Sequence, residues 1–421
     1  MCTATTFGIY KKVYLAMQLM TWDRRTFIAG TGAGVAGMLA GCVGGDDGSG
    51  NGNASGNGNG NGNGNGNGNG NGNGNGNGNG NGNGNGNGNG NGNGDPMQVG
   101  MVYATGGLGD QSFNDMAHEG IQQAQEDLGL EFRNAEPDAP ADVGALQRNF
   151  ARSSDPDFGL ICCIGFVQET DLVENATDFP DQNWMIVDAV ASDDDGPLDN
   201  VASYVYREHE GSFQVGVLAG MLTGMDYSHG GGSTNTDEQM VGFVGGQEIP
   251  LIERFEAGYR AGVQHVDAEI GFTSAYAGDW NDPATGQEIA TGMYDDGADI
   301  VYHAAGGTGA GVFEAAQSEG RYAIGVDSDQ SRSAAEFSDV IVASMTKRVD
   351  TAIYESANNA ANDSFQGGQI NDLGLAEDGI GTVIGQDFEG ELPAEITDEL
   401  ETTRQSIIDG DISVPDTLDD V

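Results

Sequence analysis

The chain has 421 residues and carries 65 acidic side chains against 15 basic ones, so its formal net charge at pH 7 is −50. Because such a surface repels phosphate backbones, we expect no nucleic-acid partner. The charge indicates instead a solvated acidic surface suited to high salt, where self-repulsion is screened, as in halophilic proteins.

Residues 1–41 have the pattern of an export signal. Arg24 and Arg25 form a twin-arginine pair before the apolar stretch 29–41, which is too short to span a bilayer. The stretch ends in LAGC, which resembles a lipobox, so we expect cleavage before Cys42 and a lipid on its thiol. The alternative is an ordinary signal with a coincidental cysteine, and Met20 is an alternative start. The expected location is the extracytoplasmic face of the cell membrane, with the protein held there by lipid.

Residues 42–96 are predicted to form a disordered tether. They consist almost entirely of Gly and Asn with a few acidic residues, and such a composition cannot bury apolar surface. A flexible coil of this length has a mean reach of about 40 Å. The tether would therefore hold the rest of the chain away from a membrane.

The remaining residues alternate between short apolar runs and longer amphipathic segments. The predicted strands cover residues 97–103, 131–134, 160–164, 184–188, 201–206, 239–244, 270–276, 300–303, 322–326, 340–344 and 381–384. The predicted helices cover residues 116–128, 140–153, 171–179, 208–225, 251–263, 283–295, 311–319, 347–365 and 394–409. This order predicts an α/β protein with parallel sheets. The strands are too many for one sheet, so we expect two doubly wound lobes around a cleft; a (β/α)₈ barrel is the alternative.

Polar and aromatic residues follow several of these strands, where open α/β sheets bind their ligands. Lys347 stands out because every other lysine lies in the first twelve residues. The candidates at strand ends are Phe113, Asn114, Asp188, Trp280, Asp282, Gly307, Thr308, Asp327 and Lys347. Aromatic faces suit a planar heterocycle, carboxylates accept hydrogen bonds from hydroxyl groups, and a lysine donates to oxygen. The set therefore favours a nucleoside over a phosphate, which the carboxylates would repel.

Each candidate also has a purely structural interpretation. Phe113 would serve as a core residue, Trp280 as a hinge cover, and Asp188 and Asp327 as helix caps. Lys347 would be a surface ion-pair partner, and the glycine loop at 306–309 a tight turn.

Signatures of enzymes and metal sites do not occur in the sequence. No Walker A, G-x-S-x-G or complete G-x-G-x-x-G motif is present, and the five histidines lack ligand spacing. We expect no catalytic residue, no metal and no cofactor. Cys162 and Cys163 lie in an apolar run, which favours buried strand residues over a vicinal disulfide.

Several motifs together resemble a known family. They are GDQSFND at 109–115, EG at 119–120, SFQVGVLAG at 212–220, VGFVGG at 241–246, FEAGY at 255–259, GGTG at 306–309, IGVDSDQ at 324–330 and TKRVD at 346–350. In this order they resemble the basic membrane lipoprotein family, the substrate-binding components of ABC transporters for purine nucleosides.

The resemblance implies a type I periplasmic-binding-protein fold. The expected first lobe comprises residues 97–206 and 328–366, and the second comprises 207–327 and 367–421. The implied function is delivery of a nucleoside, with purine favoured over pyrimidine, to an ABC permease and ATPase by a monomeric binding protein. The alternatives are a tethered nucleoside or sugar receptor that signals through a membrane partner and, more remotely, a nucleoside-cleaving enzyme.

The resemblance also implies roles for the candidate residues. Phe113 and Trp280 would sandwich the base, while Asn114 would bond its edge. Asp188 would reach the base or the sugar, and Asp327 with Lys347 would hold the ribose hydroxyls. The loop containing Gly307 and Thr308 would add backbone donors. On this interpretation, replacing Lys347 with methionine weakens binding without unfolding the protein.

Overall fold

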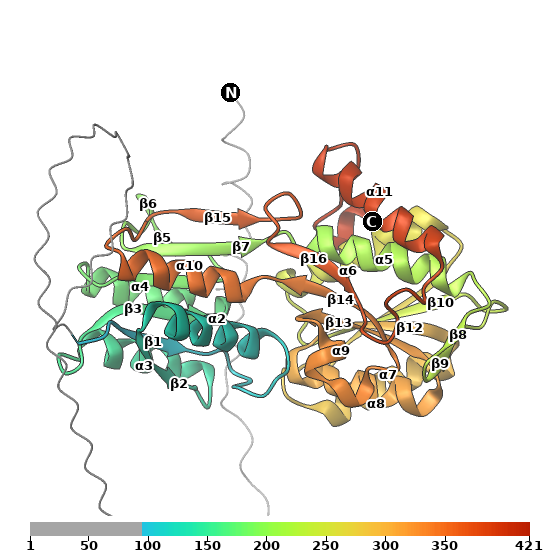
Figure 1. Ribbon diagram of the computed structural model, residues 1–421, viewed down its shortest axis with the longest axis horizontal. Helices are drawn as coiled ribbons and strands as arrows, with labels where there is room; N and C mark the ends of the chain where they lie inside the picture. The colour runs from blue at the N-terminus through green and yellow to red at the C-terminus, as the bar shows by residue number, and fades with distance from the viewer. Residues whose placement is uncertain (1–94) are drawn as a thin grey trace, which may run out of the picture. The chain divides into compact units, whose positions relative to one another are not determined.

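Two open sheets, each covered by helices on both faces, make up residues 95–421, the part of the chain that the computed structural model describes (Figure 1). The predicted export signal, Cys42 and nearly all of the predicted tether lie outside these residues. Within residues 95–421, no helix combines the length and the apolarity needed to cross a bilayer.

The first lobe contains a six-stranded sheet in the order β2-β1-β3-β4-β7-β15, and all of its neighbouring strands run parallel. Its elements are β1 (Gln98–Val102), α2 (Phe113–Leu128), β2 (Glu131–Ala135), η1 (Pro140–Asp142), α3 (Val143–Ala151), β3 (Phe158–Ile164), η2 (Phe166–Gln168), α4 (Glu169–Asp178), β4 (Trp184–Val187), β7 (Val201–Tyr206), α10 (Val349–Ala361) and β15 (Ile370–Leu373).

The second lobe contains a six-stranded sheet in the order β11-β10-β12-β13-β14-β16, in which only β16 is antiparallel to its neighbour. Its elements are α5 (Glu208–Thr223), β10 (Met240–Gly245), α6 (Pro250–Val266), β11 (Gly271–Tyr276), α7 (Pro283–Asp295), β12 (Ala298–Ala304), η3 (Gly306–Thr308), α8 (Gly309–Glu319), β13 (Tyr322–Asp327), α9 (Gln330–Ser333), η4 (Ala335–Phe337), β14 (Ile341–Lys347), β16 (Ile380–Ile384) and α11 (Ala394–Ile408).

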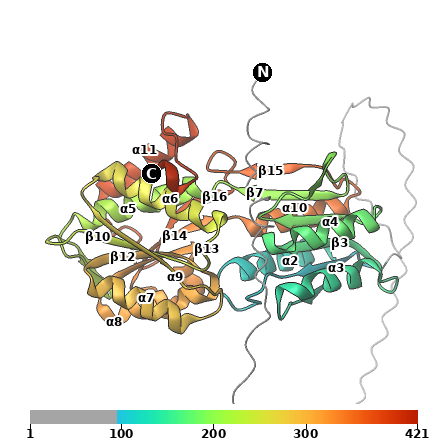
Figure 2. The same ribbon diagram turned by 180° about the vertical axis from the view of Figure 1, so that it is seen from behind.

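The strands are apolar on both faces because helices cover both faces of each sheet. In β3, Cys162 packs on the side of α2 and α10, and Cys163 packs on the side of α4. Figures 1 and 2 show these helices on opposite faces of the sheet. Both thiols are free and buried, so the prediction of buried strand cysteines is confirmed.

Helices α5 and α6 touch along their backbones in the second lobe. A Cβ atom on Gly216 would lie 2.2 Å from the carbonyl oxygen of Tyr259, and one on Gly262 would lie 2.1 Å from that of Phe213. Only glycine allows so close an approach. The contact fixes α6, whose N-terminal turn forms part of the cavity described below.

The chain crosses between the lobes three times, after β7, after β14 and between β15 and β16. These positions correct the predicted lobe boundaries. Residues 328–347 remain in the second lobe, because β14 pairs with β13, and the return to the first lobe comes only with α10. Strand β15, predicted to belong to the second lobe, pairs with β7 in the first.

Every predicted strand and helix is present, with ends shifted by a few residues. The sequence pattern missed β15, the short helix α9 and two hairpins of two-residue strands. The hairpins are β5 (Ser192–Asp193) with β6 (Gly196–Pro197), and β8 (Ser228–His229) with β9 (Gly232–Ser233). All of these are short, which leaves too few residues for a period to be recognised.

Candidate ligand-binding site

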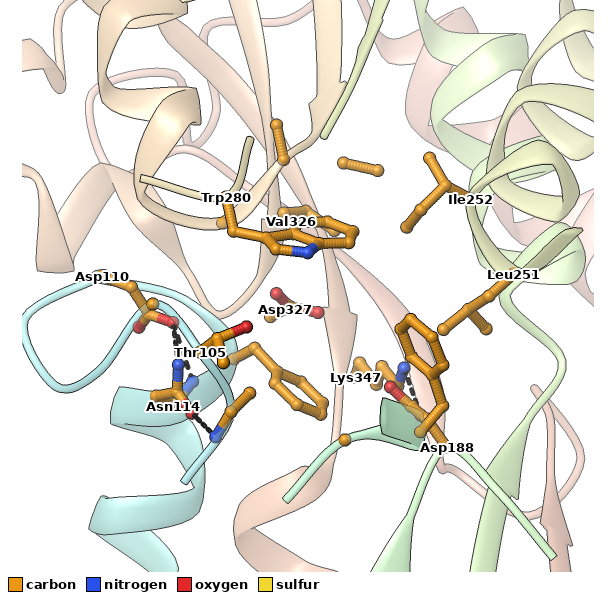
Figure 3. Close-up of a pocket in the computed structure, with 18 of the residues that line it drawn as sticks. Thr105, Asp110, Asn114, Asp188, Leu251, Ile252, Trp280, Val326, Asp327 and Lys347 are labelled. Carbon is orange, nitrogen blue, oxygen red and sulfur yellow. Dashed lines mark hydrogen bonds and ion pairs between the residues drawn. The ribbon is translucent and has the colours of Figure 1, made fainter. Parts of the chain in front are cut away.

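A cavity of about 100 Å³ lies between the lobes, where strands of both sheets end (Figure 3). The strands β1, β3 and β4 of the first lobe and β12, β13 and β14 of the second lead into its wall. Its lining residues are Ala104, Thr105, Gly106, Asp110, Phe113, Asn114, Gly165, Phe166, Val167, Asp188, Leu251, Ile252, Phe255, Trp280, Ala304, Ala305, Gly306, Val326, Asp327 and Lys347.

The loop from β1 to α2 supplies the wall of the first lobe, and Asp110 organises it. The Asp110 carboxylate accepts hydrogen bonds from the backbone N–H groups of Ser112 and Asn114 and from the Asn114 side chain, at 2.9–3.0 Å. The side-chain carbonyl oxygen of Asn114 accepts a hydrogen bond from the backbone N–H of Ala104 at 2.9 Å. Burial raises the pKa of Asp110, and these backbone donors oppose that shift. Asn114 is therefore held rigidly and keeps one amide hydrogen free of these bonds.

Lys347 ends β14 and is buried in an ionic network that joins the two lobes. Its Nζ lies 2.6 Å from the Asp188 carboxylate of the first lobe and 3.0 Å from that of Glu208 at the start of α5. The Nη1 atom of Arg254 on α6 lies 3.2 Å from the second carboxylate oxygen of Glu208, Oε2. Figure 3 shows Lys347 and Asp188 paired at one edge of the cavity.

The network keeps Lys347 charged. Burial alone lowers the pKa of an ammonium group, but Asp188, Glu208 and then Asp327 outweigh it and raise the pKa of Lys347. Nζ also lies 5.0–5.7 Å from the centroids of three aromatic rings, those of Phe113, Tyr206 and Phe255. Two of the three ammonium hydrogens serve the two carboxylates, which leaves one for a ligand.

Asp188 directly follows β4 and Asp327 is the last residue of β13, and both adopt left-handed backbone conformations, with φ of 68° and 66°. This region is unfavourable for residues other than glycine, and such strain is concentrated at functional sites. Burial raises the pKa of Asp188, against the opposing effect of Lys347. Both backbone turns direct carboxylates toward the cavity.

Asp327 is a buried carboxylate whose pKa lies close to neutral pH. Its side chain is buried and accepts a hydrogen bond from the Ser112 hydroxyl of the other lobe. Burial raises the pKa of Asp327 to about 6; Lys347 and Ser112 oppose the rise, whereas Asp110 and Asp188 add to it.

Trp280, from the loop after β11, lies over the cavity, with Asp327 below it and Leu251 and Ile252 to one side (Figure 3). Its six-membered ring packs on Gly246, where a Cβ atom would lie only 2.4 Å from the ring. The cavity thus combines aromatic and aliphatic walls with charged groups at its edges. That combination suits a flat apolar ring carrying hydroxyl or amine donors.

The structure brings six of the nine predicted ligand residues together in the cavity wall. They are Phe113, Asn114, Asp188, Trp280, Asp327 and Lys347.

The structure does not bring the other three, Asp282, Gly307 and Thr308, into the cavity wall. Asp282 caps α7 by accepting from the backbone N–H and hydroxyl of Thr285. Thr308 is buried, and its hydroxyl accepts from the backbone N–H of Asp282. Gly307 lies beside the Asn281 side chain, while its neighbour Gly306 faces the cavity. The loop turns into η3 at once, which directs only its first glycine inward.

Sequence reasoning missed more than half of the residues that line the cavity. The rule that ligand residues follow strands also applies to Thr105 after β1 and to Phe166 and Val167 after β3. Asp110 lay inside a recognised motif without a role assigned to it. Leu251, Ile252 and Phe255 come from α6, and Glu208 reaches the site only through Lys347, so no strand-end pattern marks them. Within the described residues, no group of three or more His, Cys, Asp or Glu side chains is placed to hold a metal ion.

The solved structure of an ABC transporter solute-binding protein from Aeropyrum pernix K1 has a similar fold. It aligns with a TM-score of 0.67 at 28% identity, over 77% of this chain and 95% of that one. A second solute-binding protein, from Conexibacter woesei DSM 14684, aligns with a TM-score of 0.59 at 22% identity, over 76% of this chain and 99% of that one. These similarities confirm the predicted fold of two doubly wound lobes around a cleft, of the type I periplasmic-binding-protein kind.

Sequence comparisons also find similarity to ABC transporter substrate-binding proteins. The CD4+ T-cell-stimulating antigen of Listeria monocytogenes is 34% identical over 336 residues, which cover 76% of this chain and 88% of that protein. The ABC transporter nucleoside-binding protein BmpA of Lactococcus lactis is 30% identical over 337 residues, which cover 76% of this chain and 89% of that protein. The family model Bmp, described as ABC transporter substrate-binding protein PnrA-like, matches residues 97–418. The chain therefore belongs to the Bmp family of PnrA-like ABC transporter substrate-binding proteins.

Proposed function

We propose that this protein binds a nucleoside, with purine favoured, and delivers it to an ABC permease without chemical turnover. The observation that carries the proposal is the pairing, in one cavity, of the aromatic face of Trp280 with the hydroxyl-binding groups Asp327 and Lys347. The similarity to a relative named as nucleoside-binding supports it. Three carboxylates in the wall disfavour a phosphorylated ligand, which would have to overcome their repulsion.

The proposed ligand places its base between Phe113 and Trp280. The remaining amide hydrogen of Asn114 would serve the edge of the base, and the carboxylate of Asp188 would reach the base or the sugar. The ribose hydroxyls would donate to Asp327, while the third ammonium hydrogen of Lys347 would reach a sugar oxygen.

The proposal includes a location and partners. A lipid on Cys42 would anchor the protein to the extracytoplasmic face of the cell membrane, and the Gly/Asn tether would let it reach the permease and its ATPase. We propose that it works as a monomer. Related proteins from Pyrococcus are named as lipoproteins, which supports the anchor.

Isothermal titration in high salt against inosine, guanosine, adenosine, uridine and ribose tests this function. Base–aromatic stacking contributes about 1–3 kcal/mol per base, so nucleosides should bind at least about fivefold more tightly than ribose. The nucleoside proposal fails if no nucleoside binds, or if ribose binds equally well.

Nucleoside affinity should fall about tenfold between pH 7 and pH 5. The pKa of Asp327 is raised to about 6, so its carboxylate is largely ionised at pH 7 and largely protonated at pH 5. A protonated carboxyl accepts hydroxyl donors less well. The free energy of unfolding of the ligand-free protein should change in the opposite direction, rising as the pH falls through about 6. Burial disfavours the ionised form of Asp327, so protonation relieves that cost and adds stability.

Titration of the nucleoside at several pH values measures this effect. The Asp327→Asn variant is the matched control, since it cannot ionise there, and its affinity should be lower than that of the wild type at pH 7 and flat down to pH 5. A variant that keeps the wild-type pH profile would assign the effect to another group, such as Asp110 or Asp188.

A further inference from the structure

The lobes also touch through a contact that involves no chain crossing. The backbone carbonyl oxygen of Gln111, in the loop before α2, faces three donors of the second lobe. They are Gln330 Nε2 at 3.1 Å, Ser328 Oγ at 3.2 Å and Ser333 Oγ at 3.2 Å. Gln111 adopts a left-handed backbone conformation, with φ of 52°, that is unfavourable for a residue with a Cβ atom. We call Gln111, Ser328, Gln330 and Ser333 the interlobe contact. Figure 1 shows the loop before α2 reaching toward α9.

Gln330 is the residue that directs this contact. It is almost completely buried, and its Oε1 accepts from the backbone N–H of Val326 at 2.7 Å. The same oxygen lies 2.9 Å from His303 Nε2. Because a backbone N–H must donate, Oε1 is fixed as the acceptor and Nε2 is left to point across the cleft.

His303 helps to fix the orientation of the Gln330 side-chain amide. It is fully buried, and burial lowers its pKa to about 4, so it is neutral at pH 7. A neutral imidazole carries one N–H, and the acceptor Oε1 requires that hydrogen on Nε2. Gly309 makes room for the ring, since a Cβ atom there would lie 2.0 Å from it. The amide of Gln330 is therefore held in one orientation by two donors of its own lobe.

The interlobe contact is continuous with the ligand site in both lobes. Gln111 and Ser112 immediately precede Phe113, and Ser328 immediately follows Asp327. The Ser112 hydroxyl donates to Asp327 across the same gap. These contacts need the lobes at the spacing seen here, so any opening that separates Phe113 from Asp327 also breaks them.

We infer that Gln330 is a positioning residue that holds the lobes closed and thereby sets how slowly the bound ligand leaves. The inference rests on the proposed function for the identity of the ligand, but the contact itself is independent of it. A bond present only in the closed state stabilises that state and slows opening, while it leaves the encounter of the ligand with the open state unchanged.

The Gln330→Glu variant tests this role. The glutamate keeps an oxygen for Val326 and His303 but replaces the donor facing the Gln111 carbonyl with a carboxylate oxygen. Losing one such bond should raise the dissociation rate of inosine about tenfold at pH 8 and change the association rate by less than about twofold. Stopped-flow displacement of inosine measures both rates.

Gln317→Glu is the matched control. Gln317 is exposed on α8, and its amide donates only within the second lobe, to Glu336 and Asp339. The rate at which inosine dissociates from the Gln317→Glu variant should equal that of the wild type. Should Gln330→Glu fail to fold, the double variant Ser328→Ala/Ser333→Ala removes two donors from less buried positions and should raise the rate about threefold.

Small-angle scattering without ligand separates the two proposals. The radius of gyration should be larger for Gln330→Glu than for the wild type and for Gln317→Glu. If the wild type binds no inosine, the proposed function fails, and scattering alone decides the role of Gln330. An unchanged radius together with an unchanged dissociation rate overturns the inference.

Discussion

Replacing Lys347 with methionine is expected to lower the free energy of unfolding by about 3–5 kcal/mol, in addition to weakening nucleoside binding. Lys347 is buried between Asp188 and Glu208, 2.6 and 3.0 Å away. Methionine fills a similar volume but leaves two buried carboxylates with less opposing charge. Equilibrium unfolding by denaturant, in high salt and without ligand, measures the change. The structure thus predicts a different outcome from the sequence, which suggested that this substitution leaves folding intact.

The loss of stability should depend on pH in a defined direction. Without the ammonium group, the pKa values of Asp188 and Glu208 rise, because burial then acts with less opposition. The cost is therefore present at high pH, where both would have to be ionised, and it diminishes as the pH falls and they take up protons. The difference between variant and wild type should shrink from pH 8 to pH 5.

Arg348→Met is the matched control for Lys347→Met. Arg348 is the next residue, also basic, but it is about half exposed and pairs with Asp350 at the surface. Such exposed pairs contribute about 1 kcal/mol or less. A triple variant that combines Lys347→Met with Asp188→Asn and Glu208→Gln should recover part of the stability. Equal denaturation midpoints for Lys347→Met and the wild type would contradict the network described here.

The alternation of apolar strands with amphipathic helices was sufficient to predict the fold. The strands are buried on both faces, so they appear as continuous apolar runs, and the helices show one apolar side. The points where the chain changes lobe were not predictable in this way. Strand β14 and helix α10 follow one another without a long linker, and it is hydrogen bonding to β13 and β16 that places β14 in the second sheet.

The position of these residues near strand ends was sufficient to bring six of the nine candidates into one cavity wall, since parallel strands of one sheet end at one edge. Lys347 carried an additional compositional signal as an isolated lysine in an acidic chain. Its partners carried none. Glu208 is one of 65 acidic residues, and its contact with Lys347 spans 139 positions. A contact of that kind depends on how α5 packs against β14 within the second lobe, which no local pattern specifies.

Trp280→Ala is expected to weaken inosine binding by about 1–3 kcal/mol, or about 5- to 150-fold, and to change the free energy of unfolding by about 1 kcal/mol or less. Trp280 comes from a loop, is only half buried, and lies over the cavity with its ring against Gly246. Its removal takes away the stacking face without opening the apolar core. Titration calorimetry and denaturant unfolding of the same preparation measure the two quantities.

Trp280→Phe is the control, because a phenyl ring keeps a stacking face in the same place and should retain most of the affinity. The loss in Trp280→Ala should also be larger for inosine than for uridine, since a purine overlaps more of the indole than a pyrimidine does. For ribose, which has no base, the substitution should have little effect. An equal loss of affinity for inosine and ribose would show that Trp280 shapes the cavity as a whole and does not stack on a base.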